Sequence, residues 1–223
     1  MAPFATIYSY PNNFRVQRAH ALAALGGLEL VDSSDFIMGT TNRSEEFLAK
    51  FPMGKVPVLE TSDGFCLSEG QAIARFIAES GSKAEQLLGA DVKTRAKIEE
   101  WSSFAEQEIC ANIVPPLVMT ILKIIPFDEA KYNQCLGNLE RAIKRVEVAL
   151  KNGSGKFLVG DQLTLADIMV TGPLHLAAQL LMDPELLKAA PSLKGYLEGI
   201  FEFPEVKGAF GELKFCEARV KGQ

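Results

Sequence analysis

A change of pattern near residue 80 constrains the fold more than any other feature of this sequence. Over residues 1–80, short runs rich in β-branched and aromatic residues alternate with helix-forming segments. From about residue 92 onward, apolar residues recur at helical spacing instead. A more polar segment at residues 81–91 separates the two parts. We therefore expect an α/β domain at 1–80, a linker at 81–91 and an all-helical domain at 92–223.

The first part contains signals for both parallel and antiparallel strands. Its expected elements are strands at 4–8 and 28–31, helices at 14–25 and 44–50, strands at 56–60 and 65–67, and a helix starting at Glu69 or Gly70. The last two strands flank Asp63-Gly64, and Asp-Gly is a strong signal for a tight hairpin turn. This order predicts a small mixed sheet covered by helices.

The second part carries clear signals for the start and end of helices. Pro115-Pro116 and Pro126 are expected to end or kink its first long helix, because proline lacks the N–H that the helix needs. Thr164 and Asp167 have the spacing of a capping box, in which each side chain bonds the other residue's backbone N–H. The strongly apolar helix that follows, to about residue 181, is expected to be central, which makes Asp167 a structural residue.

Composition excludes several classes of protein. The 223 residues include 23 Lys and Arg against 28 Asp and Glu, with no basic block, so no direct binding of nucleic acid is expected. Charged residues interrupt every apolar run, so we predict no membrane span. The N-terminal MAPFATIYSY lacks the basic region of a secretory signal, which favours a cytoplasmic location.

Residues that usually carry catalysis or hold metals are few and scattered. The chain has two histidines, His20 and His175, and four cysteines that form no C-x-x-C pair. This spacing predicts neither a metal site nor a redox dithiol, and we interpret both histidines as structural. An enzyme built on this chain would need a nucleophile that the chain does not supply.

Three motifs occur in a characteristic order. They are Phe51-Pro52-Met53-Gly54-Lys55-Val56-Pro57, Leu67-Ser68-Glu69-Gly70-Gln71-Ala72-Ile73, and the segment from Phe157 to Asp167. Together they resemble the cytosolic glutathione transferases over nearly the whole chain. The resemblance implies a thioredoxin-like α/β N-terminal domain followed by an all-α C-terminal domain.

Further segments resemble one branch of that superfamily. They are residues 7–11, 41–43, 47–52, 63–66 and 210–217. They are similar to the theta-like, glutathione-transferase-like N-terminal domain of the gamma subunit of eukaryotic translation elongation factor 1. That subunit normally continues into a second conserved region, whereas this sequence stops at Gln223.

The resemblance implies a glutathione site around Val56, Pro57, Glu69 and Gly70. The Val56–Pro57 bond would be cis, and the Val56 backbone would pair with the cysteinyl part of glutathione. Glu69 would meet the ammonium of the γ-glutamyl group, and the Gly70 N–H would bind its carboxylate. Relatives usually have Ser where this chain has Gly70, so a hydroxyl is lost. Glu69 could instead be a first-turn acid that interacts with the helix dipole.

Lys55 and Arg15 are candidate cations for the carboxylates of glutathione. A protein with a net charge of −5 needs local positive groups to hold a small anion. Lys55 lies inside a matching motif, which favours a role in the site. For Arg15 a solvated surface charge is an equal alternative.

The residue that would activate the thiol is ambiguous. Transferases of this fold lower the pKa of the ligand's thiol with a hydrogen-bond donor near the end of the first strand. Ser9 and Tyr10 are equal candidates as catalytic residues, and strand alternation places them on opposite faces. Activation by an Asn side-chain amide, from Asn12 or Asn13, and a site that only binds are the remaining alternatives.

Two functions follow from the resemblance. The first is the glutathione-transferase-like domain of an elongation factor 1 gamma-type protein. It would bind glutathione and dock the nucleotide-exchange subunit, with or without weak conjugating activity. The second is a free-standing theta-like transferase that adds glutathione to small electrophiles. Both imply a homodimer with glutathione as substrate or ligand and with no metal.

Overall fold

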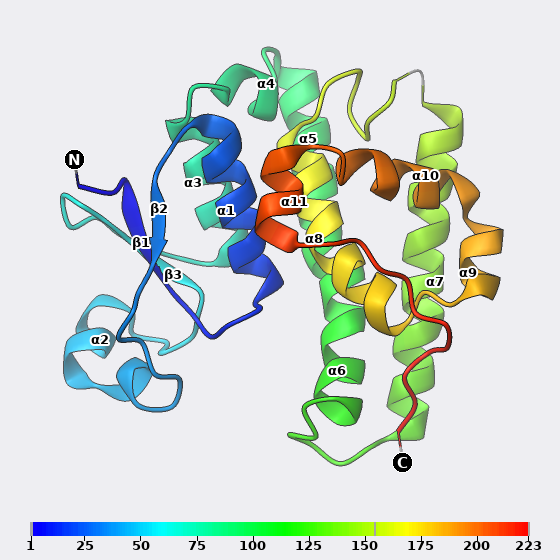
Figure 1. Cartoon of the computed structure of the whole chain (residues 1–223), viewed down its shortest axis with the longest axis horizontal. Helices are drawn as coiled ribbons and strands as arrows, with labels where there is room; N and C mark the ends of the chain where they lie inside the picture. Colours follow the sequence, from blue (N-terminus) through cyan, green and yellow to red (C-terminus); the bar gives the residue numbers. More distant parts are fainter. Residues whose placement is uncertain (1, 154, 223) are drawn as a thin grey trace.

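The N-terminal part of the chain is a four-stranded mixed sheet with helices packed on it (Figure 1). The computed structural model describes residues 2–153 and 155–222. Its first elements are β1 (Ala5–Tyr8), α1 (Phe14–Gly26), β2 (Leu30–Asp32), a short 3-10 helix (Thr41–Arg43), α2 (Glu45–Lys50), β3 (Val58–Thr61), β4 (Cys66–Ser68) and α3 (Gly70–Ser80). The strand order is β2-β1-β3-β4. β1 pairs parallel with β2, and the other pairs are antiparallel.

Local sequence accounts for the boundaries of these elements. Asn13 caps α1 by accepting a hydrogen bond from the Arg15 N–H, and Gly27 ends that helix in the left-handed conformation. The side chain of Ser44 caps α2. The third strand begins at Val58 rather than at residue 56, because Pro57 has no N–H to pair with a neighbouring strand.

In the remaining part of the chain that the structure describes, the regular elements are helices. Its elements are α4 (Ala84–Leu88), α5 (Val92–Phe104), a π-helical segment η2 (Ala105–Cys110), α6 (Ala111–Thr120), α7 (Glu129–Asn152), α8 (Leu165–Leu180), α9 (Pro184–Ala189), α10 (Pro191–Ile200) and α11 (Pro204–Phe210). The all-α second domain is thus confirmed. The segment expected to be a linker contains the short helix α4, whose Leu87 and Leu88 are buried.

Of the two outcomes expected at these prolines, an end or a kink of the helix, the end does not occur at Pro115 and Pro116. Pro115 and Pro116 both lie inside α6, which continues to Thr120. The backbone takes wider π-helical turns over Ala105–Cys110, directly before this stretch. Such turns are a recognised way of accommodating a disrupted ladder of hydrogen bonds within a continuing helix.

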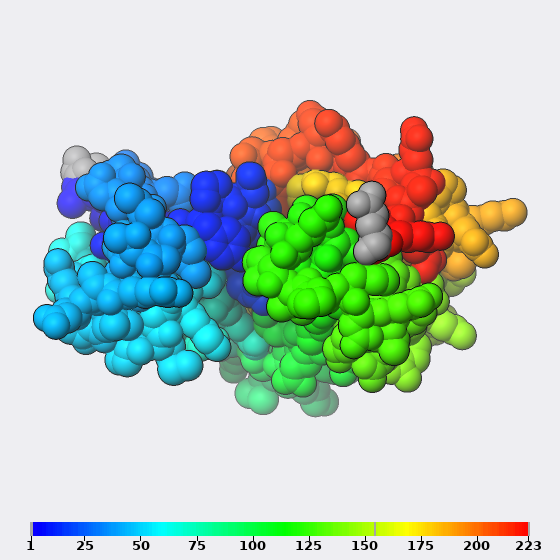
Figure 2. Space-filling view, turned by 90° about the horizontal axis from the view of Figure 1, so that it is seen from below, coloured from blue at the N-terminus to red at the C-terminus, as the bar shows by residue number. Residues whose placement is uncertain are grey.

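Helix α8 is the centre of the second domain, as expected. Thr164 and Asp167 form the predicted capping box at its start. Most of its side chains are buried, and it packs against α1, α3 and α5. A single hydrophobic core therefore runs from the sheet through α1 and α3 into the helical domain. Figure 2 shows the blue and cyan N-terminal residues meeting the green to red helical part. Among the described residues no helix is long and apolar enough to span a membrane.

His175 is a buried titratable group in the helical domain. It packs against Phe201 and Phe210, and its Nε2 lies 3.2 Å from the Glu212 carbonyl. Burial lowers its pKa, although the bond to Glu212 acts in the opposite direction. A depressed pKa means that the neutral ring stabilises the fold above the unfolded-state pKa, and that this stability is lost as pH falls through the folded-state pKa.

We therefore expect His175→Gln to flatten the dependence of thermal stability on pH. Between about pH 7 and about pH 5 the wild-type melting temperature should fall more steeply than that of the variant. Thermal melts followed by circular dichroism measure both slopes. His20→Gln is the control, because His20 is a partly exposed histidine that pairs with Asp32 at 3.0 Å. Equal slopes for wild type and His175→Gln would contradict the expectation.

Candidate functional site

A cavity of about 660 Å³ lies where the N-terminal domain meets α5 and η2. The six residues predicted to bind glutathione all contribute to its lining: Arg15, Lys55, Val56, Pro57, Glu69 and Gly70. They come from α1, from the loop before β3, and from the start of α3. The fold thus gathers into one cavity residues that lie up to 55 positions apart in the sequence.

The loop before β3 supplies one wall of the cavity. The Val56–Pro57 peptide bond is cis, as the resemblance implied. The buried side chain of Asn42 anchors this loop: its Nδ2 donates to the Gly54 carbonyl at 2.7 Å, and its Oδ1 accepts from the Gly39 N–H at 2.6 Å. Gly54 has a φ of 57°, and a Cβ there would lie only 2.8 Å from the Asn42 carbonyl oxygen. Lys55 and Val56 are therefore presented by a firmly held turn.

The start of α3 supplies the next wall. Val58 pairs with Ser68, so the end of the hairpin lies beside the cis bond. Glu69 precedes the helix with a φ of 73°, a left-handed conformation that costs a residue with a side chain about 1 kcal/mol or more. Its side chain is exposed toward the cavity, whose lining also includes Ser68. Strained backbone of this kind is concentrated at ligand-binding positions.

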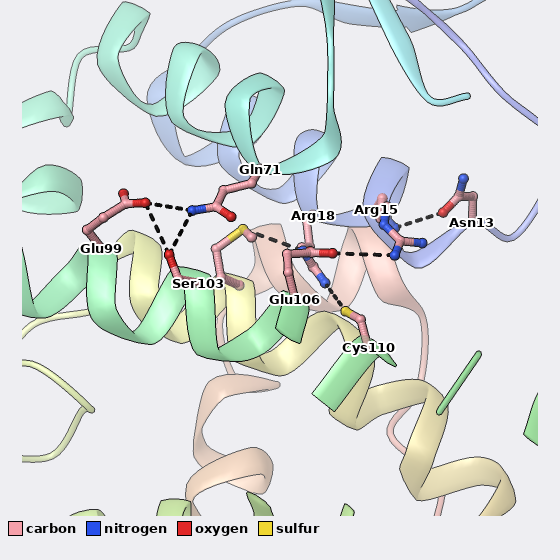
Figure 3. A network of polar contacts seen from close by, with 9 residues as sticks. Asn13, Arg15, Arg18, Gln71, Glu99, Ser103, Glu106 and Cys110 are labelled. Carbon is pink, nitrogen blue, oxygen red and sulfur yellow. Dashed lines mark hydrogen bonds and ion pairs between the residues drawn. The ribbon is translucent and has the colours of Figure 1, made fainter. Parts of the chain in front are cut away.

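Polar contacts between the two domains close the cavity (Figure 3). Glu106 of η2 pairs with Arg15 at 3.4 Å and with Arg18 at a shorter distance. From α3, Gln71 donates to Glu99 of α5 at 2.7 Å. These contacts connect α1 and α3 to the helix that runs from α5 into η2, so the cavity depends on the docking of the two domains.

Arg18 is the buried member of this network. Its side chain is 1% exposed, and besides Glu106 it contacts the sulfurs of Cys110 and Met169 at 3.2 and 3.5 Å. Burial would raise the pKa of Glu106, but the adjacent guanidinium of Arg18 more than offsets this and the pKa is lowered. Burial raises the pKa of Cys110 to about 11, so its thiol stays protonated and is not a nucleophile.

The two catalytic candidates lie elsewhere. Ser9 and Tyr10 do not line the cavity of about 660 Å³ but a second one of about 440 Å³, between the loop after β1, the end of β2 and α11. Ser9 Oγ accepts a hydrogen bond from Asn13 Nδ2 at 3.0 Å. The side-chain amide of the buried Asn13 is therefore engaged with Ser9. Asn12 stands exposed at the turn with a φ of 60°. The structure therefore does not bring either catalytic candidate into the cavity of the binding residues.

Other sequence interpretations have mixed outcomes. Asp167 is fully buried and structural, as expected. Among the described residues, no group of three His, Cys, Asp or Glu side chains is placed to hold a metal ion. Sequence reasoning missed Arg18, although it shares a helical face with Phe14 and Leu22, four residues away on either side. It also missed Glu106, because no local signal marks the π-helical turns.

Comparisons with known proteins agree with this fold. The family models for the glutathione S-transferase N-terminal and C-terminal domains match residues 4–79 and 109–204. A glutathione S-transferase-like protein from a Fusarium species is 40% identical over 211 residues, which are 95% of this chain and 94% of that protein. Elongation factor 1-gamma of Artemia salina is 32% identical over 95% of this chain, but the match spans only 47% of that protein.

A solved structure extends the likeness to three dimensions. A glutathione transferase from Phanerochaete chrysosporium, in complex with oxidized glutathione, has a TM-score of 0.83 at 15% identity and covers 94% of this chain and 96% of its own. At that identity the likeness concerns the fold alone. The matched domains, the near full-length relative and the shared fold lead to one conclusion: the chain belongs to the glutathione S-transferase family.

Proposed function

We propose that the chain binds glutathione in the cavity between its domains and acts as a theta-like glutathione transferase. The observation that carries the proposal is the placement of the cis Val56–Pro57 bond beside Glu69 in one cavity. The Val56 N–H and C=O would pair with the cysteinyl backbone of the ligand. Glu69 would bind its ammonium, and Lys55 and Arg15 its carboxylates. Relatives named glutathione S-transferase-like proteins match nearly the whole chain.

The chemistry assigns the nucleophile to the ligand. A thiolate attacks an electrophile far faster than a thiol does, so the protein must lower the pKa of the bound thiol. Neither buried Cys110 nor buried His175 reaches the cavity lining. The candidates for activation remain Ser9, Tyr10 and Asn12 of the loop that follows β1, which line a separate cavity and not this one.

Glu69→Gln tests the binding role. We expect glutathione affinity to fall about tenfold or more, because a charge-assisted hydrogen bond to the ligand's ammonium is lost. Isothermal calorimetry measures this directly. Glu79→Gln, at the exposed C-terminal end of the same helix, is the matched control and should leave affinity unchanged. An unchanged affinity in Glu69→Gln would remove Glu69 from the site.

A conjugation assay tests activation. Activity toward a chlorodinitrobenzene-type electrophile is compared for wild type, Ser9→Ala, Tyr10→Phe and Asn12→Ala. One of the three should lose most of its turnover and show a raised pKa in its pH–rate profile, while glutathione affinity stays within about twofold. Binding of glutathione without measurable turnover in the wild type would reduce the proposal to a binding module.

A docking role is the second candidate. It is favoured by the match to elongation factor 1-gamma over 95% of this chain. In this version the chain would be a cytoplasmic homodimer that holds the nucleotide-exchange subunit of that complex. Co-purification with the exchange subunit, and sedimentation of the chain alone, test the two assemblies independently of glutathione.

A further inference from the structure

We propose that the connection between α6 and α7 is a docking surface for an acidic, amphipathic helix of a partner protein. We call this surface the hairpin tip, and it consists of residues 119–127 together with Lys221. In Figure 1 the connection between the two helices forms the lower end of the molecule. Its groove shares no lining residue with the cavity of about 660 Å³. The proposal therefore goes beyond glutathione binding.

The hairpin tip exposes a run of large apolar side chains. Their exposed fractions lie between 46% and 70%, and they belong to Ile121, Leu122, Ile124 and Ile125. A single exposed apolar residue is ordinary on a protein surface, whereas a contiguous group of them marks a place where another molecule binds. This run is thus a candidate interaction surface.

Backbone hydrogen bonds fix the shape of the tip. The Leu122 N–H donates to the Leu117 carbonyl at 3.0 Å, back into the last turn of α6. The Ile124 N–H donates to the Val118 carbonyl at 2.9 Å. Between them Lys123 has a φ of 49°, and a left-handed residue of this kind commonly closes the end of a helix. The apolar side chains are therefore presented by a defined turn.

A groove of about 590 Å³ runs beside these side chains. Of the described residues, its lining includes two lysines, Lys123 and Lys221, and no acidic residue. Neither lysine forms an ion pair with a carboxylate in the part of the chain that the structure describes. Apart from Thr120, the rest of the lining is apolar: Met119, Ile124, Ile125, Pro126 and Phe127. On a protein with a net charge of −5, this groove favours a partner that is both apolar and negatively charged.

The C-terminal segment holds the second lysine at the groove. Val220, the residue before Lys221, is bonded on both sides of its backbone. Its N–H donates to the Leu180 carbonyl at 2.8 Å, and its carbonyl accepts a hydrogen bond from Tyr132 Oη. The positive wall of the groove is therefore preorganised, which reduces the cost of binding.

A helix of a partner protein fits these features better than a second copy of the chain or a lipid bilayer. In a two-fold contact centred on the tip, the lysines of the two copies would face one another and repel. A bilayer would cover the whole tip, so anionic headgroups would also meet the exposed Asp128 and Glu129 at the start of α7. These two acids do not line the groove. An amphipathic helix can lay its apolar face in the groove and set its acidic residues beside the lysines.

Two synthetic helical peptides test the proposal. Both carry leucine at helical spacing on one face, and the opposite face carries glutamate in one peptide and lysine in the other. Fluorescence anisotropy gives the affinity of each peptide for the whole chain. One double variant of the tip is Lys123→Glu with Lys221→Glu, and the other is Ile124→Ser with Ile125→Ser. All four side chains are exposed, and a thermal melt confirms that each variant is folded.

The matched control is Lys144→Glu with Val148→Ser. These residues are an exposed lysine and an exposed apolar residue one turn apart on α7. They present the same chemistry as the tip without its groove, whose lining includes neither of them. Glutathione affinity is measured for every variant by calorimetry. It should stay within about twofold, which separates a failure of the docking surface from a failure of the glutathione site.

The glutamate peptide should bind saturably, one per chain, and about tenfold or more tightly than the lysine peptide. Each double variant of the tip should weaken this binding about tenfold or more, whereas the control should change it by less than about twofold. Absence of saturable binding, equal affinity for the two peptides, or equal losses in tip and control variants would overturn the proposal.

Two further outcomes would assign the surface to another occupant and so also overturn the proposal. The first is sedimentation with phosphatidylcholine–phosphatidylserine vesicles, without peptide binding, that Ile124→Ser with Ile125→Ser abolishes. It would identify a lipid surface. The second is a concentration-dependent dimer, again without peptide binding, that the same double variant abolishes in analytical ultracentrifugation. It would identify a second copy of the chain.

Discussion

Asp167→Ala should unfold this protein more readily than any other single change to a polar residue. We expect it to lower the free energy of unfolding by about 4 kcal/mol or more. The carboxylate is fully buried and accepts four hydrogen bonds: from the backbone N–H of Leu158 and Thr164, from Thr164 Oγ1 and from Tyr196 Oη, all within 2.9 Å. Truncation leaves these donors buried without a partner, and each such loss costs about 1–3 kcal/mol.

Denaturant unfolding measures this effect. Asp128→Ala is the matched control, because Asp128 also caps a long helix but accepts a single backbone bond, from Lys131 at 2.9 Å, in an exposed position. It should cost about 1 kcal/mol. Similar losses for the two variants would show that the bonds to Leu158 and Tyr196 add nothing beyond a helix cap.

Glu106→Gln is expected to have the second largest effect on stability. It leaves the Arg18 guanidinium, 1% exposed, without a carboxylate in the interface between the domains. Removing one partner of a buried ion pair costs about 3–5 kcal/mol, whereas replacing both partners by apolar groups is often close to neutral. We therefore expect the double variant Arg18→Met with Glu106→Gln to recover most of the loss.

A double-mutant cycle measures this coupling. It compares the denaturant midpoints of wild type, Arg18→Met, Glu106→Gln and the double variant. Glu100→Gln is the control on the same continuous helix, since Glu100 pairs with Lys97 and Arg145 at a half-exposed surface. It should cost at most about 1 kcal/mol. A double variant as unstable as the sum of its parts would mean that Arg18 and Glu106 stabilise the fold independently.

The strands, helices and turns of the N-terminal domain could be predicted from the sequence because the signals for them are local. The predicted turn at Asp63-Gly64 acts within a few residues, and the structure confirms the hairpin around it. The end of α1 at Gly27 and the cap of α2 at Ser44 are equally local. The capping box at Thr164 is equally local. Five of the six expected binding residues lie in two motifs of one known fold, which accounts for their meeting in one cavity, whereas Arg15 lies in neither motif.

The remaining features of the fold and the site depend on contacts between distant residues, which no local sequence pattern encodes. Arg18 and Glu106 are 88 residues apart, and they meet only because α1 docks against a π-helical turn. Proline usually ends or kinks a helix, yet Pro115 and Pro116 lie inside α6, which directly follows the π-helical segment. Ser9 and Tyr10 lie just after the end of the first strand in sequence, but both line a different cavity from the binding residues.

The central claim is that glutathione occupies the cavity formed by the loop before β3 and the start of α3. A crystal structure of the protein with S-hexylglutathione, an unreactive analogue, tests it most directly. We expect the cysteinyl backbone to lie against Val56, the γ-glutamyl group at Glu69 and Gly70, and its α-carboxylate on Arg15. An analogue seated instead in the cavity beside Ser9 and Tyr10, away from Val56 and Glu69, would contradict it.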